Sequence, residues 1–201
     1  MSPRASEQRA TELLTGVAVS GSHDGWRRND RCRDVAGIVS LLAAPGRHDA
    51  CMRVLCVCTG NTCRSPMLEG LLRYALAQRG RSDIAVASAG IAAADGLPAS
   101  EHAVACLAAL GIDLREHRSA SIESQDLASI DHFVCMGQRH AEVLVALGVD
   151  RERIRIANQE DGGVPDPFGM DLSAYQQTAH VLAEVAAGIA DELLADTSDR
   201  A

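Results

Sequence analysis

Residues 58–66 place a cysteine and an arginine around a short polar loop, an order that suits nucleophilic chemistry on an anion. The thiolate is the nucleophilic form of cysteine, and a helix N-terminus with a guanidinium beside it favours that form. Arg64 offers a planar fork of N–H donors that can hold two phosphoryl oxygens at once. The sequence therefore predicts that Cys58 attacks a bound phosphoryl group and forms a covalent cysteinyl-phosphate intermediate.

The rest of this loop is predicted to bind the phosphoryl group. A short loop that closes on a helix N-terminus points backbone N–H groups and the positive end of the helix dipole at an anion. Gly60 and Asn61 can adopt the left-handed backbone conformations that such a tight loop requires. Ser65 can hydrogen-bond the thiolate and ease its departure when the phosphocysteine is hydrolysed. The loop residues expected to contact the substrate are Thr59, Gly60, Asn61, Thr62, Cys63 and Ser65.

Asp166 is the candidate proton donor for the leaving group. It lies between Pro165 and Pro167, and a carboxyl on a proline-stiffened loop can be held over a pocket as a general acid. The same group can then act as base for the water that attacks the phosphocysteine. Alternatively, Asp166 is only a turn residue, because Asp-Pro is common in turns. The chain shows no paired Cys-x-x-Cys and no spaced His pair, so we expect no metal ion and no cofactor.

An α/β domain is needed to position these residues. Apolar, β-branched runs predict strands at 53–58, 84–88, 132–136 and 153–156. Helical periodicity and glycine stops predict helices at 65–79, 100–110, 139–147 and 172–194. Strands that alternate with helices indicate a parallel sheet, and such sheets bind ligands at the carboxyl ends of their strands. The loop of residues 58–66 follows the first strand directly.

Residues 1–51 differ from the rest of the chain. Their middle, residues 20–30, is rich in Gly, Ser, Asp and Asn. We interpret them as an irregular N-terminal extension, disordered or loosely packed, that precedes one domain at 52–201.

Composition excludes several classes of partner. The 201 residues carry a formal net charge of −8 and contain no basic cluster, so we expect no nucleic acid partner. No apolar run approaches the ~20 residues of a membrane helix, so no membrane partner is expected, and we see no secretory signal. The seven cysteines lie mostly in apolar stretches, which is typical of free thiols in a reducing cytoplasm. Cys106 and Cys135 are predicted to be core residues, and the sequence does not specify an oligomeric state.

The signature Val54-Leu55-Cys56-Val57-Cys58-x-Gly60-Asn61-x-Cys63-Arg64-Ser65-Pro66 resembles that of the low-molecular-weight protein tyrosine phosphatase family. The late Asp166-Pro167 pair, before the last helix, also matches this family, and the resemblance extends from residue 52 to about residue 194. It implies a four-stranded parallel sheet with helices on both faces. It also implies Cys58 as nucleophile, Arg64 as phosphate clamp and Asp166 as general acid and base.

The same resemblance gives further residues supporting roles. Asn61, Ser88 and His117 resemble the network that fixes the family's phosphate loop. Cys63 resembles the neighbour that can form a reversible disulfide with the nucleophile under oxidation.

The resemblance leaves two substrates open, both carried by phosphorylated proteins. Tyrosine-specific members commonly carry two aromatic residues after the Asp-Pro, whereas here Phe168 is followed by Gly169. Thr62 stands where those members usually have Ile or Leu. Both features resemble the bacterial protein-arginine phosphatase branch. We therefore expect phosphoarginine or phosphotyrosine, with a narrow preference for phosphoarginine, and Phe168 as a wall of the pocket.

Two other functions use the same loop. A thiol-dependent arsenate reductase would need resolving cysteines near residues 130–140, where Cys135 lies in a strand-like run. A non-catalytic anion-binding or redox-sensing module would use Cys58 and Cys63 alone. The presence of nucleophile, clamp and acid together favours the phosphatase.

Overall fold

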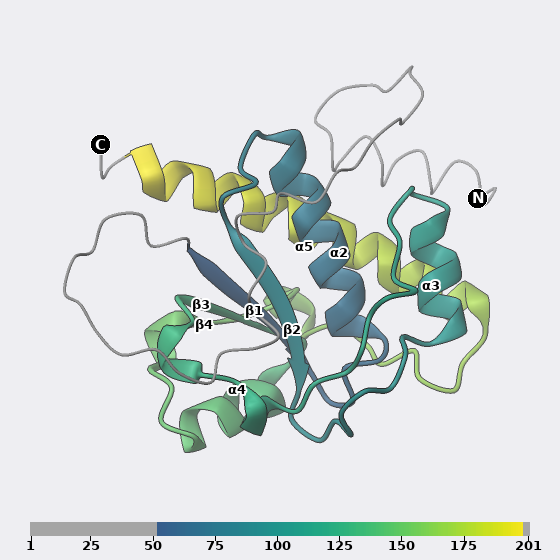
Figure 1. Ribbon diagram of the computed structural model, residues 1–201, viewed down its shortest axis with the longest axis horizontal. Coiled ribbons are helices and arrows are strands. Elements are labelled where there is room, and N and C mark those ends of the chain that lie inside the picture. Colours follow the sequence, from purple (N-terminus) through teal and green to yellow (C-terminus); the bar gives the residue numbers. More distant parts are fainter. Residues whose placement is uncertain (1–51, 199–201) are drawn as a thin grey trace.

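In the computed structural model, described for residues 52–198, four parallel strands form a sheet in the order β2-β1-β3-β4 (Figure 1). The strands are β1 (Arg53–Cys58), β2 (Ala85–Gly90), β3 (His132–Cys135) and β4 (Ile154–Ile156). β1 is an inner strand, and its residues from Val54 to Cys58 are all buried, which explains its uninterrupted apolar sequence. The predicted extension 1–51 lies outside the described residues.

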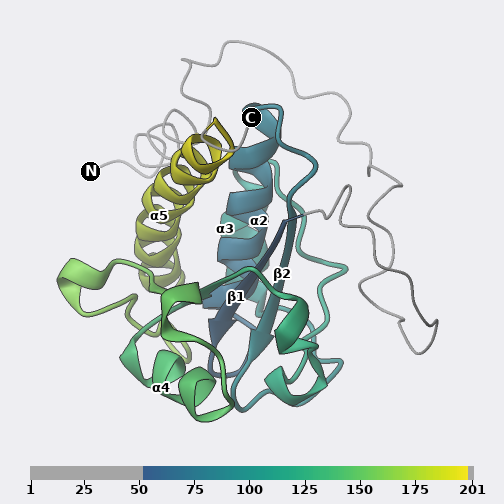
Figure 2. The ribbon, with the colours of Figure 1, turned by 90° about the vertical axis from the view of Figure 1, so that its left-hand side faces the viewer.

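Helices cover both faces of the sheet, as Figure 2 shows. One face carries α2 (Arg64–Gln78), α3 (Glu101–Ala108) and α5 (Leu172–Ser198), and the other carries α4 (Gln138–Ala146). Val54 and Cys56 pack into the core beneath α2 and α5, whereas Leu55 and Val57 pack on the side of α4, because successive strand residues point to opposite faces. The predicted fold class is confirmed.

Element boundaries differ from the predictions by a few residues. β2 continues to Gly90 rather than ending at 88, because the parallel register pairs Gly90 with Cys58 at the end of β1. α5 continues to Ser198, beyond the predicted end at 194. Four 3₁₀ turns in the described chain were not predicted: Ile122–Ser124, Leu127–Ser129, Arg151–Arg153 and Gln159–Asp161.

The topology places one loop in a special position. β1 is flanked by β2 on one side and by β3 on the other, so the chain winds in opposite directions from β1. In open α/β sheets, the crevice at such a reversal, outside the carboxyl ends of the strands, is where ligands bind. The segment between Cys58 and α2 occupies this point.

None of the described helices is both long enough and apolar enough to cross a membrane.

Candidate active site

The loop between β1 and α2 has the backbone shape expected of an anion site. Asn61 adopts a left-handed conformation with φ of 54°. The same prediction for Gly60 is wrong, since Gly60 is not among the described residues with positive φ, and a Cβ there would make only an ordinary contact with Thr62 Oγ1 at 3.7 Å. Cys63 precedes the first turn of α2 without capping it through its side chain. No side chain therefore competes from the cap position for the first N–H groups of the helix.

The sulfur of Cys58 sits inside this loop. Its Sγ lies 3.0 Å from Ser65 Oγ and 3.3 Å from the backbone nitrogen of Asn61, which donates to it. Ser65 Oγ accepts a hydrogen bond from Asn61 Nδ2 at 2.8 Å, and its own proton can be donated to the sulfur at 3.0 Å or to the carbonyl oxygen of Ala89 at 3.4 Å. The loop thus offers two hydrogen-bond donors to a negatively charged sulfur.

Asn61 is the centre of a network that fixes the loop. Its side chain is fully buried, donates to Ser88 Oγ at 2.9 Å and accepts from the backbone nitrogen of Ala120 at 2.8 Å. His117 Nε2 lies 2.8 Å from the carbonyl oxygen of Asn61. Ser88 in turn donates to Glu69 Oε2 at 2.7 Å. The structure therefore brings Asn61, Ser88 and His117 together, behind the loop rather than in front of it.

Glu69 and Gly90 are parts of this network that the sequence analysis did not assign. Glu69 accepts the last hydrogen bond of the chain that runs from Asn61 through Ser88, and its other oxygen forms an ion pair with Arg73 at 3.3 Å. A Cβ on Gly90 would lie 2.5 Å from the carbonyl oxygen of Thr59 and 2.9 Å from the nitrogen of Asn61, so only glycine fits there. The position of Gly90, opposite the nucleophile on the neighbouring strand, is the signal that could have identified it.

Arg64 links the loop to the segment that carries Asp166. Its guanidinium is buried and donates through Nη1 to the carbonyl oxygen of Val164 at 3.0 Å and through Nη2 to Asp166 Oδ2. Its Nε is buried and makes no hydrogen bond within the described chain. A guanidinium with one unpaired donor at the wall of a pocket is suited to bind an anion.

A pocket opens over the sulfur, and most of the predicted substrate-binding residues line it. Its lining residues are Cys58, Thr59, Gly60, Thr62, Cys63, Arg64, Asp166 and Phe168. Phe168 is 74% exposed, so its ring forms an open rim. Asn61 and Ser65, which were also predicted to contact substrate, are completely buried side chains beneath the loop. They can act on a substrate through backbone N–H groups and through the sulfur.

Cys63 has a partner that its sequence neighbours do not reveal. Its Sγ lies 3.1 Å from the hydroxyl of Tyr175 on α5 and 3.5 Å from Ser100 Oγ. Burial, together with the contact to Cys63, raises the pKa of Tyr175 to about 12. The phenol is therefore neutral and anchors the wall of the pocket to the last helix.

His140 is a second residue that the sequence analysis did not assign to the site. It is buried in the first turn of α4, and its Nε2 lies 3.1 Å from Thr59 Oγ1 in the loop. Burial, and then the positive charge of Arg64, lower its pKa. Thr59 follows β1 and His140 lies in the helix that follows the neighbouring strand β3, so no short-range pattern connects them.

The other described cysteines lie in the core. Burial raises the pKa of Cys135 to about 12 and that of Cys56 well above its usual range. None of the cysteines between residues 52 and 198 forms a disulfide. Within the same residues, no group of three or more His, Cys, Asp or Glu side chains could hold a metal ion.

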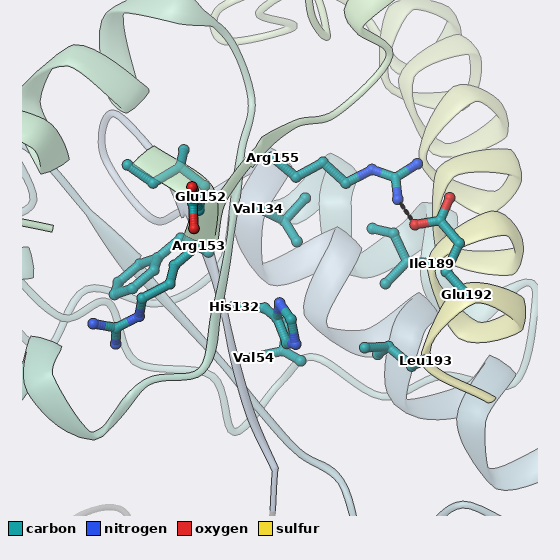
Figure 3. A pocket seen from close by; sticks show the side chains of 11 residues that line it. Val54, His132, Val134, Glu152, Arg153, Arg155, Ile189, Glu192 and Leu193 are labelled. Carbon is teal, nitrogen blue, oxygen red and sulfur yellow. Dashed lines mark hydrogen bonds and ion pairs between the residues drawn. The ribbon is translucent and has the colours of Figure 1, made fainter. Parts of the chain in front are cut away.

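A second hollow lies at the opposite, amino-terminal end of the strands (Figure 3). It is lined mainly by residues of β3, β4 and α5, and Arg155 forms an ion pair with Glu192 across it. It contains none of the predicted site residues.

Known proteins with similar sequences are phosphatases. Residues 53–199 match the family model of the low molecular weight phosphotyrosine protein phosphatase. A protein-arginine-phosphatase of Bacillus subtilis is 33% identical over 150 residues, which are 72% of this chain and 99% of that protein. The low molecular weight protein-tyrosine phosphatase A of Mycobacterium tuberculosis is 34% identical over 149 residues, covering 70% of this chain and 90% of the relative.

A solved structure extends this similarity to three dimensions. It is the YwlE arginine phosphatase, in a cysteine-to-serine mutant with a phosphorylated active site serine. It is 33% identical, covers 71% of this chain and 95% of its own, and superposes with a TM-score of 0.65. The chain therefore belongs to the low molecular weight phosphotyrosine protein phosphatase family and is a hydrolase of that type.

Proposed function

We propose that this chain hydrolyses phosphorylated side chains of proteins through a phosphocysteine formed on Cys58. The observation that carries the proposal is the placement of Cys58 Sγ under two hydrogen-bond donors, in one pocket with the guanidinium of Arg64. A thiolate there faces a phosphoryl group whose oxygens are met by the amides of the loop and by Arg64.

The first step transfers the phosphoryl group to sulfur. The thiolate of Cys58 attacks phosphorus, an S–P bond forms, and the bond from phosphorus to the substrate oxygen or nitrogen breaks. Asp166 gives its proton to that leaving atom. Arg64 now donates to Asp166, so we propose that the phosphoryl oxygens take over the guanidinium and release the carboxyl for this task.

The second step hydrolyses the intermediate. The carboxylate of Asp166 accepts a proton from water as the water attacks phosphorus, and the S–P bond breaks. The sulfur leaves as a thiolate, which accepts a hydrogen bond from Ser65 and from the backbone nitrogen of Asn61. Inorganic phosphate is released and the enzyme returns to its starting state.

The substrate side chain is proposed to be phosphoarginine or phosphotyrosine, with the preference set by Thr62 and Phe168 at the pocket. One exposed aromatic ring gives a phenyl group little enclosure, and this favours the narrower guanidino group. The two relatives named for arginine and for tyrosine are almost equally identical to the chain and do not separate these substrates. Turnover of matched phosphoarginine and phosphotyrosine peptides tests the preference. If Thr62→Ile leaves their ratio unchanged, this account of the pocket is wrong.

Oxidation is proposed to join Cys58 and Cys63 reversibly. Peroxide would convert the thiolate of Cys58 to a sulfenic acid, and the thiol of Cys63 would displace water from it to form the disulfide. Peptide mapping after peroxide treatment should find the Cys58–Cys63 disulfide. The enzyme should regain its activity when the disulfide is reduced. Over-oxidised Cys58 without the pair would refute the proposal.

The arsenate reductase alternative finds less support. That chemistry needs a resolving thiol that can leave the core and reach the loop, whereas Cys135 is fully buried in β3 and burial raises its pKa to about 12. An assay with an aryl phosphate tests the phosphatase directly: turnover should be abolished by Cys58→Ser. Arsenate-dependent thiol oxidation without phosphate release would favour the alternative.

A further inference from the structure

We propose that His140 is a positioning residue that orients the hydroxyl of Thr59 toward the phosphoryl group. This inference rests on the proposed function and assigns a residue beyond it. Thr59 follows the nucleophile directly and lines the pocket, and its Oγ1 lies 3.1 Å from His140 Nε2. Among the described side chains, no other one is hydrogen-bonded to Thr59. The direction of its hydroxyl proton is therefore determined by the imidazole.

The position of His140 is tightly constrained. Its side chain is buried in the first turn of α4, which starts directly after Gly137. Gly137 forms a bridge with Gly163, where a Cβ would lie 2.6 Å from the carbonyl oxygen of Met136. The same carbonyl accepts from the nitrogen of Val164 at 2.9 Å. The end of β3 thus holds both His140 and the segment that leads to Asp166, so the imidazole can keep the phosphate loop in register with the acid.

The imidazole must be neutral and in one tautomer to leave the Thr59 proton free. Burial and the charge of Arg64 lower the pKa of His140, and Arg139 acts in the same direction, while Asp166 and the backbone of Gly137 act against them. The contact with the backbone of Gly137 falls short of hydrogen-bond geometry, and Nδ1 is buried without a hydrogen-bond partner in the described chain. A proton on Nε2 avoids an unpaired buried N–H group and makes Nε2 the donor to Oγ1. The hydroxyl of Thr59 can then donate to a phosphoryl oxygen.

Two matched variants separate this role from packing. A glutamine amide reaches the place of Nε2, whereas an asparagine amide reaches only that of Nδ1. We expect His140→Gln to stay within about threefold of wild type in kcat/KM, and His140→Asn to lose about tenfold, the usual effect of one hydrogen bond to a charged group. Equal losses in both variants would indicate a packing role and overturn the proposal.

A double-mutant cycle with Thr59→Val tests whether His140 acts through Thr59. If it does, the loss caused by His140→Asn shrinks to less than about twofold in the Thr59→Val background, because the hydroxyl to be oriented is gone. The same factor in both backgrounds would contradict the proposal. Thr59→Val alone should lose at least as much as His140→Asn. A Thr59→Val enzyme with wild-type kcat/KM and phosphate affinity would refute it even if the His140 variants failed to fold.

Calorimetric binding of inorganic phosphate separates failure of this inference from failure of the proposed function. A wild-type protein that binds phosphate but turns over neither phosphotyrosine nor phosphoarginine peptides would refute the proposed function. The His140 inference would then stand or fall on phosphate affinity alone, which should weaken about tenfold in both His140→Asn and Thr59→Val.

Discussion

The two hollows at opposite ends of the sheet show what distinguishes a reactive site from a surface depression. At the amino-terminal end, Arg155 is paired with Glu192 (Figure 3). Arg153, also at this end, donates to the carbonyl oxygens of Leu127 and Ile130. At the carboxyl end, Arg64 keeps a buried Nε without a hydrogen bond in the described chain. Both sites are concave, but among the residues described only the site at the carboxyl end has an unpaired hydrogen-bond donor beside a thiol.

The difference follows from the direction of the strands. At the carboxyl ends, the chain turns from β1 into the N-terminus of α2, so backbone N–H groups and the positive helix end point into the pocket. At the amino ends, no α-helix N-terminus lies among the lining residues, and the two arginine side chains are paired with a carboxylate or with carbonyl groups. The comparison predicts that substitutions at the first place change catalysis and that those at the second do not.

The largest effect is expected for Cys58→Ser. The variant should lose turnover of an aryl phosphate completely and still bind inorganic phosphate, because the amides and Arg64 remain in place. Activity and calorimetry measure the two properties separately. Surviving turnover would contradict the assignment of the nucleophile.

The next effect is that of Asp166→Ala. We expect kcat to fall by ~10²–10⁴ with peptide substrates, as for the loss of a general acid. Asp171, in the same segment, accepts from the nitrogen of Ala174 and serves as matched control, so Asp171→Asn should retain activity. Equal effects of the two variants would indicate that Asp166 is only a turn residue.

Arg64→Lys compares the two arginine sites directly. A lysine keeps the charge but not the planar fork, so we expect a loss of ~10²–10³ in kcat/KM. The same change in the other hollow, Arg155→Lys, should leave kcat/KM within about twofold, because this exposed pair lies far from the chemistry. Steady-state kinetics of both variants measure the contrast. A loss in Arg155→Lys comparable to that in Arg64→Lys would remove the basis of the comparison.

Thiol labelling gives a smaller contrast between Cys58 and Cys135. Burial raises the pKa of Cys135 to about 12, so near neutral pH it is almost entirely the unreactive thiol. Iodoacetamide should therefore inactivate the enzyme by modifying Cys58, with protection by phosphate, as peptide mapping can show. Cys135→Ser should remain active. If the Cys135→Ser variant had no activity, that result would instead support a resolving role for Cys135.

The smallest expected effect is the contribution of His140 to the loss of folding stability at acid pH. Its pKa is lower in the folded protein than in the unfolded chain, so the unfolded chain takes up the proton first as the pH falls. This contribution to stability is present above about pH 6.5 and is lost below it. Urea unfolding of wild type and His140→Gln across this range should show a weaker acid loss in the variant. Parallel curves would contradict a buried, neutral His140.

The sequence predicted what local order determines. Cys58, Arg64 and Ser65 belong to one strand–loop–helix segment, so their juxtaposition follows from the chain itself. The α/β class followed from alternating periodicities. The sequence offered both Gly60 and Asn61 for the left-handed conformation in the loop, and the structure shows that Asn61 adopts it.

Contacts between distant segments were not predictable in the same way. Thr59 meets His140, and Cys63 meets Tyr175, only after β3 and α5 have packed beside the loop. Glu69 was equally hidden, because its bond to Ser88 depends on how α2 lies on β2. A single sequence records the residue types at these positions but not which pairs the packing brings together.

The most direct test of the account is to trap the intermediate. A good leaving group such as nitrophenolate departs without a general acid, whereas hydrolysis of the phosphocysteine still needs a base, so the Asp166→Ala variant should accumulate the intermediate. Rapid acid quenching and peptide mass spectrometry should find one phosphoryl group on the peptide that contains Cys58. Nitrophenolate release by this variant with no phosphoryl group on that peptide, or with the group on another residue, would contradict the account.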